Sequence, residues 1–163
     1  RRGGRRDVTA AIGGAVAERL PHIDLLLRSP WVVQLDEGRG FPTGGERLEL
    51  CVANAASFVA QKILVLDKRD PRDAAKDLVY IHDTLLIFGS SLEVLAELWR
   101  RTLETHPRTG KDLAGRARNL LAGPTDDVRR AVQVLRHLGR PHAPDERGLL
   151  EVLRIGLGTL FSL

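Results

Sequence analysis

The chain has 163 residues, of which 43% are hydrophobic and 28% are charged. This composition is typical of one globular domain or two small ones, and no apolar run reaches the roughly 20 residues that a membrane-spanning helix needs. No secretory signal is visible, and Cys51 as the single cysteine excludes an intramolecular disulfide and an all-cysteine zinc site. We therefore expect a globular protein of a reducing, cytoplasmic compartment with no membrane partner.

The formal net charge is +4, and much of the excess comes from four arginines in the first six residues. A positive net charge allows nucleic acid or nucleotide phosphate as a partner, but the sequence has no basic cluster after these first residues. Residues 1–7 are rich in arginine and glycine, and we expect them to be disordered. The chain contains no methionine, which suggests that it is a fragment.

Residues 8–53 are predicted to be rich in β-structure. A short helix is expected at 8–20, weakened by Gly13 and Gly14 and ended by Pro21. Alternating side chains at 22–27 predict a strand. Two further strands, at 31–35 and 48–53, flank a glycine-rich loop and are predicted to form a hairpin.

Residues 54–163 have helical periodicity and are predicted to form a bundle of about five helices. Asn54 or Ser57 can cap the first helix, and Pro71 occupies a favoured first-turn position of the next, which should end near Phe88. Because the strands come first and the helices follow, the chain should be α+β rather than a repeated βαβ fold. The expected divisions are 1–7, 8–53 and 54–163.

Lys62 lies among apolar residues of the first predicted helix. A charge taken out of water costs free energy unless it has a partner. Two interpretations are open. The lysine stem can pack while its amine reaches water, or the amine can be held for a phosphate or a carboxylate.

A dense charge run follows from Arg69 to Asp77. It can be a solvated helix start with weak local ion pairs. One face of that helix carries Lys76, Tyr80 and Asp83. A face with a lysine, a tyrosine and an aspartate is a more specific pattern than a charge run, and it fits a contact with a phosphate or a sugar. Asp83 and its neighbour His82 should point in different directions, so no catalytic dyad is expected.

Asp24 lies in an apolar segment. A carboxylate there can ligate Mg²⁺ if other carboxylates join it, whereas a lone one usually caps or pairs at a strand edge. The five histidines show no metal-ligand spacing, and the glycine pairs lack the pattern of a phosphate-binding loop. Cys51 is expected to be packed and inert.

These segments together carry a family resemblance, over residues 22–89. The matching sequence is HIDLLL, a glycine-rich hairpin and then LELCVANAASFVAQKILVLDKRDPRDAAKDL. It resembles the later half of bacterial nucleotidyltransferase-fold proteins, which include minimal nucleotidyltransferases and toxin-type members of abortive-infection systems. The resemblance implies an enzyme that uses a nucleoside triphosphate with Mg²⁺.

The resemblance also assigns roles to residues. Asp24 matches the third metal-binding carboxylate, and Phe58 with Lys62 matches the helix motif. Arg69, Lys76 and Asp77 match the family's Arg…Lys-Asp element. It thus implies catalytic roles for Asp24 and Asp77, with Asp24 also at the metal. Phosphate or nucleotide contacts are implied for Lys62, Arg69, Lys76 and Tyr80.

The chain departs from the family pattern in two places. No Gly-Ser or Asp-x-Asp motif precedes Asp24, and Tyr80 stands where the second aspartate of Lys-Asp-x-x-Asp is usual. Two-metal chemistry needs the paired carboxylates, so this chain alone should be inactive. The alternative hypotheses are a non-catalytic helical module that binds a protein or nucleic acid, and a nucleic-acid binder that uses the arginine-rich start.

Overall fold

The structure is a computed structural model, and it describes residues 9–12, 15–18, 21–105, 107–140 and 142–163. Its described part begins with two small β-hairpins and a short helix and continues as a helical bundle. The α+β class predicted from the sequence is confirmed. The predicted disordered start at 1–7 lies outside the described residues.

The first hairpin replaces the helix expected at 8–20, so that prediction was wrong. Strands β1 (Thr9–Ile12) and β2 (Ala15–Glu18) pair antiparallel, with Ile12 opposite Ala15. The register leaves two residues between the strands, and the sequence there is Gly-Gly. A Gly-Gly dipeptide weakens a helix, so the sequence here disfavours the helix that was expected.

The segment after Pro21 is a helical turn, not the strand expected at 22–27. Helix α1 (Ile23–Leu26) follows His22, whose φ is 59°. Only Leu25 is buried, while Ile23 and Leu27 stay exposed. Alternation in the sequence therefore did not correspond to two faces of a sheet. Asp24 consequently lies on a helical turn that packs on the first long helix.

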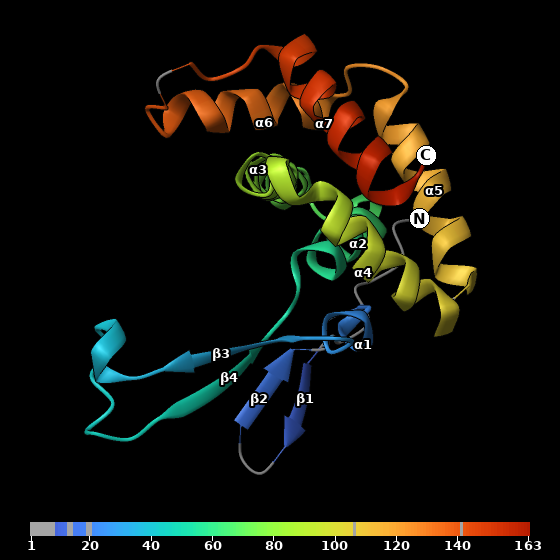
Figure 1. Cartoon of the computed structure of the whole chain (residues 1–163). Helices are drawn as coiled ribbons and strands as arrows, with labels where there is room; N and C mark the ends of the chain where they lie inside the picture. Colours follow the sequence, from blue (N-terminus) through green and yellow to red (C-terminus); the bar gives the residue numbers. More distant parts are fainter. Residues whose placement is uncertain (1–8, 13–14, 19–20, 106, 141) are drawn as a thin grey trace.

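The second hairpin confirms the strands predicted around the glycine-rich loop. β3 (Trp31–Leu35) and β4 (Leu48–Val52) pair antiparallel, with Val33 opposite Leu50. The two hairpins form separate two-stranded sheets. Figure 1 shows β3 and β4 projecting away from the helices. Cys51 is exposed on this hairpin, contrary to the prediction that it is packed, because no second layer covers β4 among the described residues.

Six helices follow in the described part of the chain. They are α2 (Ala55–Val65), α3 (Pro71–Ile87), α4 (Leu92–Thr105), α5 (Pro107–Leu121), α6 (Asp126–His137) and α7 (Glu146–Phe161). Polar side chains cap four of them: the side-chain oxygens of Asn54, Asp70, Thr125 and Asp145 accept hydrogen bonds from first-turn backbone N–H groups. These bonds satisfy donors that a helix start leaves unpaired, which explains why the helices begin at these residues.

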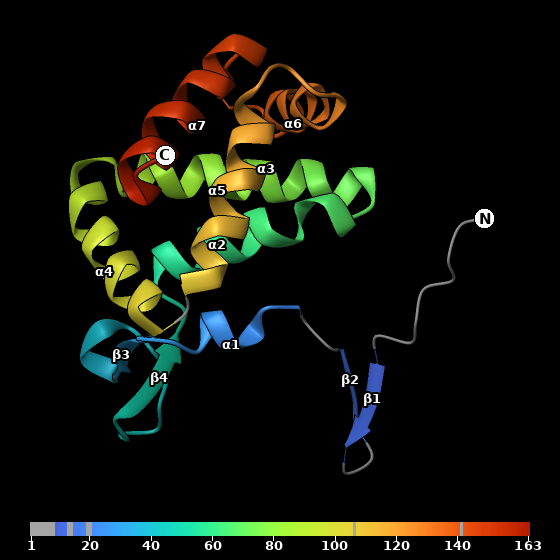
Figure 2. The same cartoon turned by 90° about the vertical axis from the view of Figure 1, so that its right-hand side faces the viewer.

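Helix α3 lies at the centre of the bundle. Figure 2 shows it crossing between α2 on one side and α6 and α7 on the other. Leu78 and Ile81 on α3 are fully buried, with Leu153 and Leu157 of α7 in the same core. The core therefore fixes α2 against α3, which determines where their polar side chains meet.

Within the described residues, no single helix is long and apolar enough to cross a membrane. The segments Pro71–Ile87 and 89–104 pass such a test only as a pair, and they are bent by 68° relative to each other.

Candidate functional site

The central polar contact of the bundle joins α2 to α3. Nζ of Lys62 lies 2.6 Å from Oδ1 of Asp77, and the two side chains are 14% and 5% exposed. Asp77 is buried because its helix face turns toward α2. Of the two interpretations of Lys62, the structure supports a cation held by a carboxylate, since the amine is paired inside the protein rather than solvated.

Arg69 completes this contact. It follows the 3₁₀ turn Leu66–Lys68, and its extended backbone leads into α3. Nε of Arg69 lies 3.1 Å from Oδ2 of Asp77, so both carboxylate oxygens accept from a cation. We refer to Lys62, Arg69 and Asp77 as the Asp77 triad. Two positive charges and one negative charge leave it with a formal charge of +1.

Two aromatic rings flank the lysine of the triad. Nζ of Lys62 is 5.5 Å from the ring centroid of Phe58 and 5.5 Å from that of Tyr80. These distances allow cation–π attraction, which adds to the ion pair where the cation is shielded from water. The ring of Phe58 is partly buried, whereas Tyr80 is half exposed. The triad therefore has an aromatic surface on its solvent side.

Lys76 and Asp24 do not take part in the triad's hydrogen bonds. Nζ of Lys76 lies 3.7 Å from Oδ1 of Asp73, one turn earlier on α3, and both side chains are well exposed. Asp24 is exposed on α1. The segment that carries it is held to α2 by a 3.2 Å hydrogen bond from Nε2 of Gln61 to the carbonyl oxygen of Pro21.

The described residues do not fit a Mg²⁺ site. Among the described residues, no group of three or more His, Cys, Asp or Glu side chains is placed to hold a metal ion. Both oxygens of Asp77 are occupied by cationic donors, which a magnesium ion would have to displace. One exposed carboxylate, Asp24, does not form a metal site by itself.

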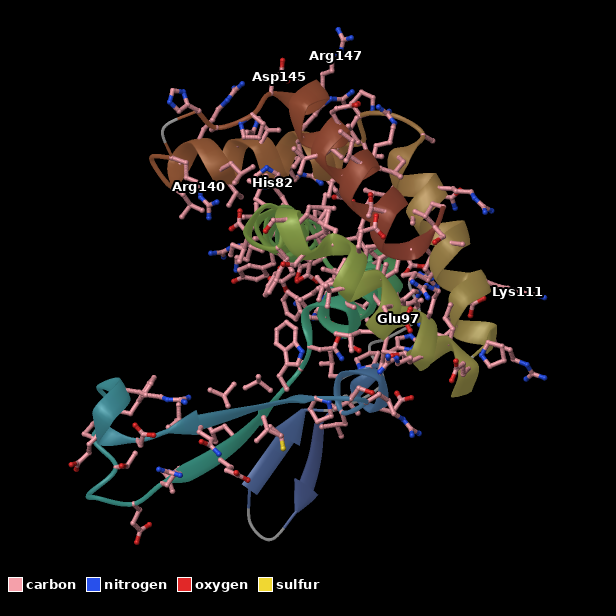
Figure 3. All side chains as sticks on the ribbon, viewed as in Figure 1. His82, Glu97, Lys111, Arg140, Asp145 and Arg147 are labelled. Carbon is pink, nitrogen blue, oxygen red and sulfur yellow. The ribbon has the colours of Figure 1, made fainter. Side chains whose placement is uncertain are left out.

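A second polar cluster was missed by the sequence analysis. Arg140, in the segment between α6 and α7, donates two hydrogen bonds to Asp83 of α3, at 2.5 and 2.6 Å. Nδ1 of His82 lies 3.2 Å from the same carboxylate, so the prediction that these neighbours do not meet was wrong. Figure 3 shows His82 and Arg140 in the region where α3 and α6 face each other. Nothing in the sequence near Arg140 indicates this partner, which is 57 residues away.

The charge state of Asp83 follows from these contacts. Partial burial raises the pKa of Asp83, but the hydrogen bonds and charges of Arg140 and His82 outweigh burial and hold the pKa below its ordinary value of 3.8. The hydrogen bond to Asp83 in turn raises the pKa of Arg140. Asp83 is thus an ionised anchor for the α6–α7 segment rather than a proton donor near neutral pH.

Two cavities of the described structure are not lined by the triad. One, of about 670 Å³, lies between the turn at 66–68, α5 and the start of α6, and Arg116 forms an ion pair with Asp67 there. The other, of about 660 Å³, lies between the first half of α3 and α6. The triad reaches solvent through the side chain of Arg69, which is 29% exposed, and lies beside Tyr80, which is half exposed.

The comparison with known families decides the assignment. Residues 1–104 match the family model described as Nucleotidyltransferase, which covers more than half of the chain. The chain belongs to the nucleotidyltransferase family. The matched part of the chain includes the whole Asp77 triad, Tyr80 and Asp24, whereas α5, α6 and α7 follow the match. No curated protein and no solved structure matches the chain.

Proposed function

We propose that the Asp77 triad binds the phosphates of a nucleoside triphosphate, in a protein that transfers a nucleotide to a hydroxyl group. One observation supports this most directly: two cations share a single buried carboxylate beside a half-exposed aromatic ring. Family membership supports nucleotidyl transfer in general. The particular role of each triad residue is our proposal.

The charges of the triad suit a polyphosphate. Asp77 neutralises only one of the two cations, and the remaining positive charge is set in a shielded environment where electrostatic attraction is strong. Arg69 is 29% exposed and is the more accessible of the triad's two cations, since Lys62 is 14% exposed. A guanidinium group can donate two parallel hydrogen bonds to the oxygens of one phosphate. Arg69 would therefore contact the phosphate first, and Lys62 would contact it from a more buried position.

Asp77 would orient the two cations rather than exchange a proton with substrate. Its ion pairs keep Lys62 and Arg69 in fixed positions, so little order has to be imposed when phosphate binds. Tyr80 would contact the sugar or base of the nucleotide, since its ring is half exposed beside Lys62. Lys76 would assist from the exposed face of α3, where it attracts anions without a fixed geometry.

The transfer step forms a bond between the acceptor oxygen and the α-phosphorus while the bond from that phosphorus to pyrophosphate breaks. Because the described residues do not fit Mg²⁺, we derive no step through the metal. Asp24 remains a proposed metal contact that requires further carboxylates. We propose that this chain corresponds to the later half of the family's site and is inactive by itself. The acceptor can be a nucleic acid, a protein or a small molecule.

Calorimetric titration with each of the four nucleoside triphosphates in Mg²⁺ buffer tests the phosphate site. Arg69→Ala and Lys62→Met remove one cation each, and methionine keeps the apolar stem of the lysine. Both variants should weaken binding by at least about tenfold, since a charge-assisted hydrogen bond contributes about 1.5–3 kcal/mol. Lys68→Ala is the matched control, because Lys68 is exposed in the turn before Arg69.

The outcome separates two functions. If the wild type binds none of the four nucleotides, or if Arg69→Ala binds as tightly as Lys68→Ala, the phosphate site is refuted. The alternative is a non-catalytic binding module, which the lack of a carboxylate cluster among the described residues favours. In that case Lys62→Met and Lys76→Ala change only the stability, and Lys62→Met should have the larger effect because its partner is buried.

A further inference from the structure

A cavity of about 660 Å³ lies between the start of α3 and one face of α6, and we call it the α3–α6 cavity. Figures 1 and 2 show α6 crossing α3, and the two helices pack on each other. Small-molecule sites in proteins typically have volumes of about 300–1,000 Å³. The cavity is lined by Asp70, Pro71, Arg72 and Ala75 at the start of α3, and by Arg130, Gln133, Val134, His137 and Leu138 of α6.

The cations of this lining favour an anionic ligand. Arg72 is exposed and forms no side-chain ion pair within the part of the chain that the structure describes. Arg130 forms a 3.3 Å ion pair with Asp127, one turn earlier on α6, and its side chain is 45% exposed. Exposed pairs of this kind are weak, so the Arg130 guanidinium can turn toward a ligand. Each of the two helices thus supplies one available guanidinium group.

The carboxylate in the lining does not cancel this charge. Oδ1 of Asp70 accepts hydrogen bonds from the backbone N–H groups of Arg72 and Asp73, at 3.0 and 3.1 Å. Two arginines and one aspartate give the lining a formal charge of +1, before any charge on His137. The cavity beside α5 differs, because it is lined by three carboxylates and two cations. Charge complementarity therefore favours an anion at the α3–α6 cavity in particular.

The apolar part of the lining favours a ligand that is more than an inorganic ion. Ala75 is buried, Val134 is partly buried against the core, and Leu138 is 58% exposed. Covering an exposed apolar side chain with an apolar group releases water and stabilises the complex. The amide of Gln133 can both donate and accept hydrogen bonds to a polar edge of the same ligand.

We propose that the α3–α6 cavity binds a small organic phosphate monoester that carries a flat apolar ring. Arg72 and Arg130 would hold the phosphate, because each guanidinium can donate two parallel hydrogen bonds to phosphate oxygens. The ring would cover Val134 and Leu138. A phosphate monoester is close to a dianion at neutral pH and so matches two arginines, whereas a carboxylate offers a single charge.

This inference does not rest on the proposed nucleotide site. Ala75 and Asp77 are two residues apart on α3, and positions at that spacing point to different sides of a helix. Asp77 contacts Lys62 of α2, whereas the cavity lies against α6. The family match ends at residue 104, so it does not include α6, which supplies one wall of the cavity. The two sites can therefore be tested separately.

The test uses the whole chain, isotope-labelled for nuclear magnetic resonance, with phenyl phosphate as the probe. Proton–nitrogen correlation spectra follow the backbone amides during titration with phenyl phosphate, inorganic phosphate or benzoate. Phenyl phosphate should give saturable shifts at Ala75, Gln133 and Val134. Inorganic phosphate lacks the ring and benzoate lacks the second charge, so each should bind about tenfold more weakly or worse.

Variants assign the binding to the cavity. Arg72→Gln should weaken phenyl phosphate binding by at least about tenfold, since it removes a charged hydrogen-bond donor. Leu138→Glu places a carboxylate at the exposed edge of the cavity and should weaken binding as well. Arg118→Gln is the matched control, because Arg118 is an exposed arginine of α5 that does not line the cavity. Arg69→Ala removes a cation of the triad and should leave the affinity for phenyl phosphate unchanged.

Arg72 and Leu138 are exposed, so both variants should fold, which circular dichroism verifies. If one does not, the other variant and the three titrations of the wild type still decide. The proposal is overturned if phenyl phosphate shifts no amide of the cavity, or if Arg72→Gln binds it as tightly as Arg118→Gln. Equal binding of inorganic phosphate or of benzoate also overturns it, since this would be adventitious anion binding only. Shifts confined to Lys62 and Arg69 overturn it too, but they support the phosphate site of the triad.

Discussion

Lys62 and Asp77 are 15 residues apart in the sequence, and Nζ of the lysine lies 2.6 Å from Oδ1 of the carboxylate. The contact joins two helices that the apolar core already holds side by side. Arg69 takes the other oxygen, which leaves Asp77 with a cation on each side. A single buried carboxylate thus determines the positions of both cations.

Replacing Asp77 by asparagine should strongly destabilise the protein. The change leaves the Lys62 and Arg69 cations without a counter-charge in a shielded site, and breaking a buried ion pair in this way costs about 3–5 kcal/mol. Urea unfolding followed by circular dichroism measures the free energy of unfolding. A loss below about 1 kcal/mol would mean that the cations are solvated, as in surface ion pairs.

Adding Lys62→Met to Asp77→Asn should recover part of that loss. The double variant removes one of the two uncompensated charges and keeps an apolar stem between Phe58 and Tyr80. Residues in direct contact show interaction energies of about 0.5–3 kcal/mol in a double-mutant cycle. Purely additive free energies of unfolding would contradict the ion pair.

The contribution of Asp83 to stability should depend on pH. Its pKa in the folded protein is held below 3.8, lower than in the unfolded chain, where no such contacts exist. The carboxylate is therefore stabilising above about pH 4, and this contribution is lost as the pH falls through the folded value. Wild type and Asp83→Asn should accordingly differ in melting temperature at pH 7 and converge at acid pH.

Arg140→Gln should reproduce the neutral-pH loss of Asp83→Asn, because each variant removes one side of the same pair. The double variant should be no less stable than either single variant. Arg136→Gln serves as a control from the end of α6, since Arg136 is an exposed arginine close in sequence. A difference in melting temperature between wild type and Asp83→Asn that persists or widens toward acid pH would contradict the ionised state assigned to Asp83.

The second hairpin and the long helices were predictable because their signals are local. A glycine-rich loop between apolar runs indicates a hairpin, and cap residues such as Asn54 and Thr125 mark helix starts. The segment at 22–27 was not predictable in this way. Its alternation resembled a strand, but packing of Leu25 against α2 favours a helical turn.

The three residues of the Asp77 triad were each named as candidates from the sequence, but their grouping was not predicted. Lys62 stood out as a charge on an apolar face, and Asp77 as part of a charge run that matches the family's Lys-Asp element. Their pairing depends on how α2 crosses α3. Lys76 belongs to the same charge run and contacts Asp73 instead. Arg140 could not be identified from the sequence, because nothing local distinguishes it from other exposed loop arginines. Only the fold brings it close to Asp83.

Asn54→Ala should destabilise the junction between hairpin and bundle. Oδ1 of Asn54 accepts from the backbone N–H of Ser57 at 2.9 Å, and Nδ2 donates to the carbonyl oxygens of Arg28 and Ser29 at 3.2 and 3.0 Å. Loss of the cap costs about 1 kcal/mol, and unpaired carbonyls add about 1–3 kcal/mol. We expect a total of about 2–4 kcal/mol by urea unfolding.

Ser57→Ala is the contrasting variant for Asn54→Ala. Oγ of Ser57 is buried and makes no hydrogen bond in the described structure. Removing it keeps the capped N–H and eliminates an unsatisfied polar atom, so the free energy of unfolding should stay unchanged or rise. If both variants lose stability equally, the cap is not the reason for the loss in Asn54→Ala.

Gly156→Ala tests the closest approach in the core. A Cβ at this position of α7 would lie 2.7 and 2.8 Å from the two methyl carbons of Leu85 and 3.0 Å from its Cγ. Leu85 is buried on α3 and has little room to move, so overpacking should cost about 1–3 kcal/mol and outweigh alanine's better helix propensity.

Gly158→Ala is the control in the same helix, because a Cβ there meets no described atom within 4 Å. It should raise stability by about 0.5–1 kcal/mol in the same thermal unfolding experiment. Equal effects at the two positions would mean that α7 does not pack closely on α3.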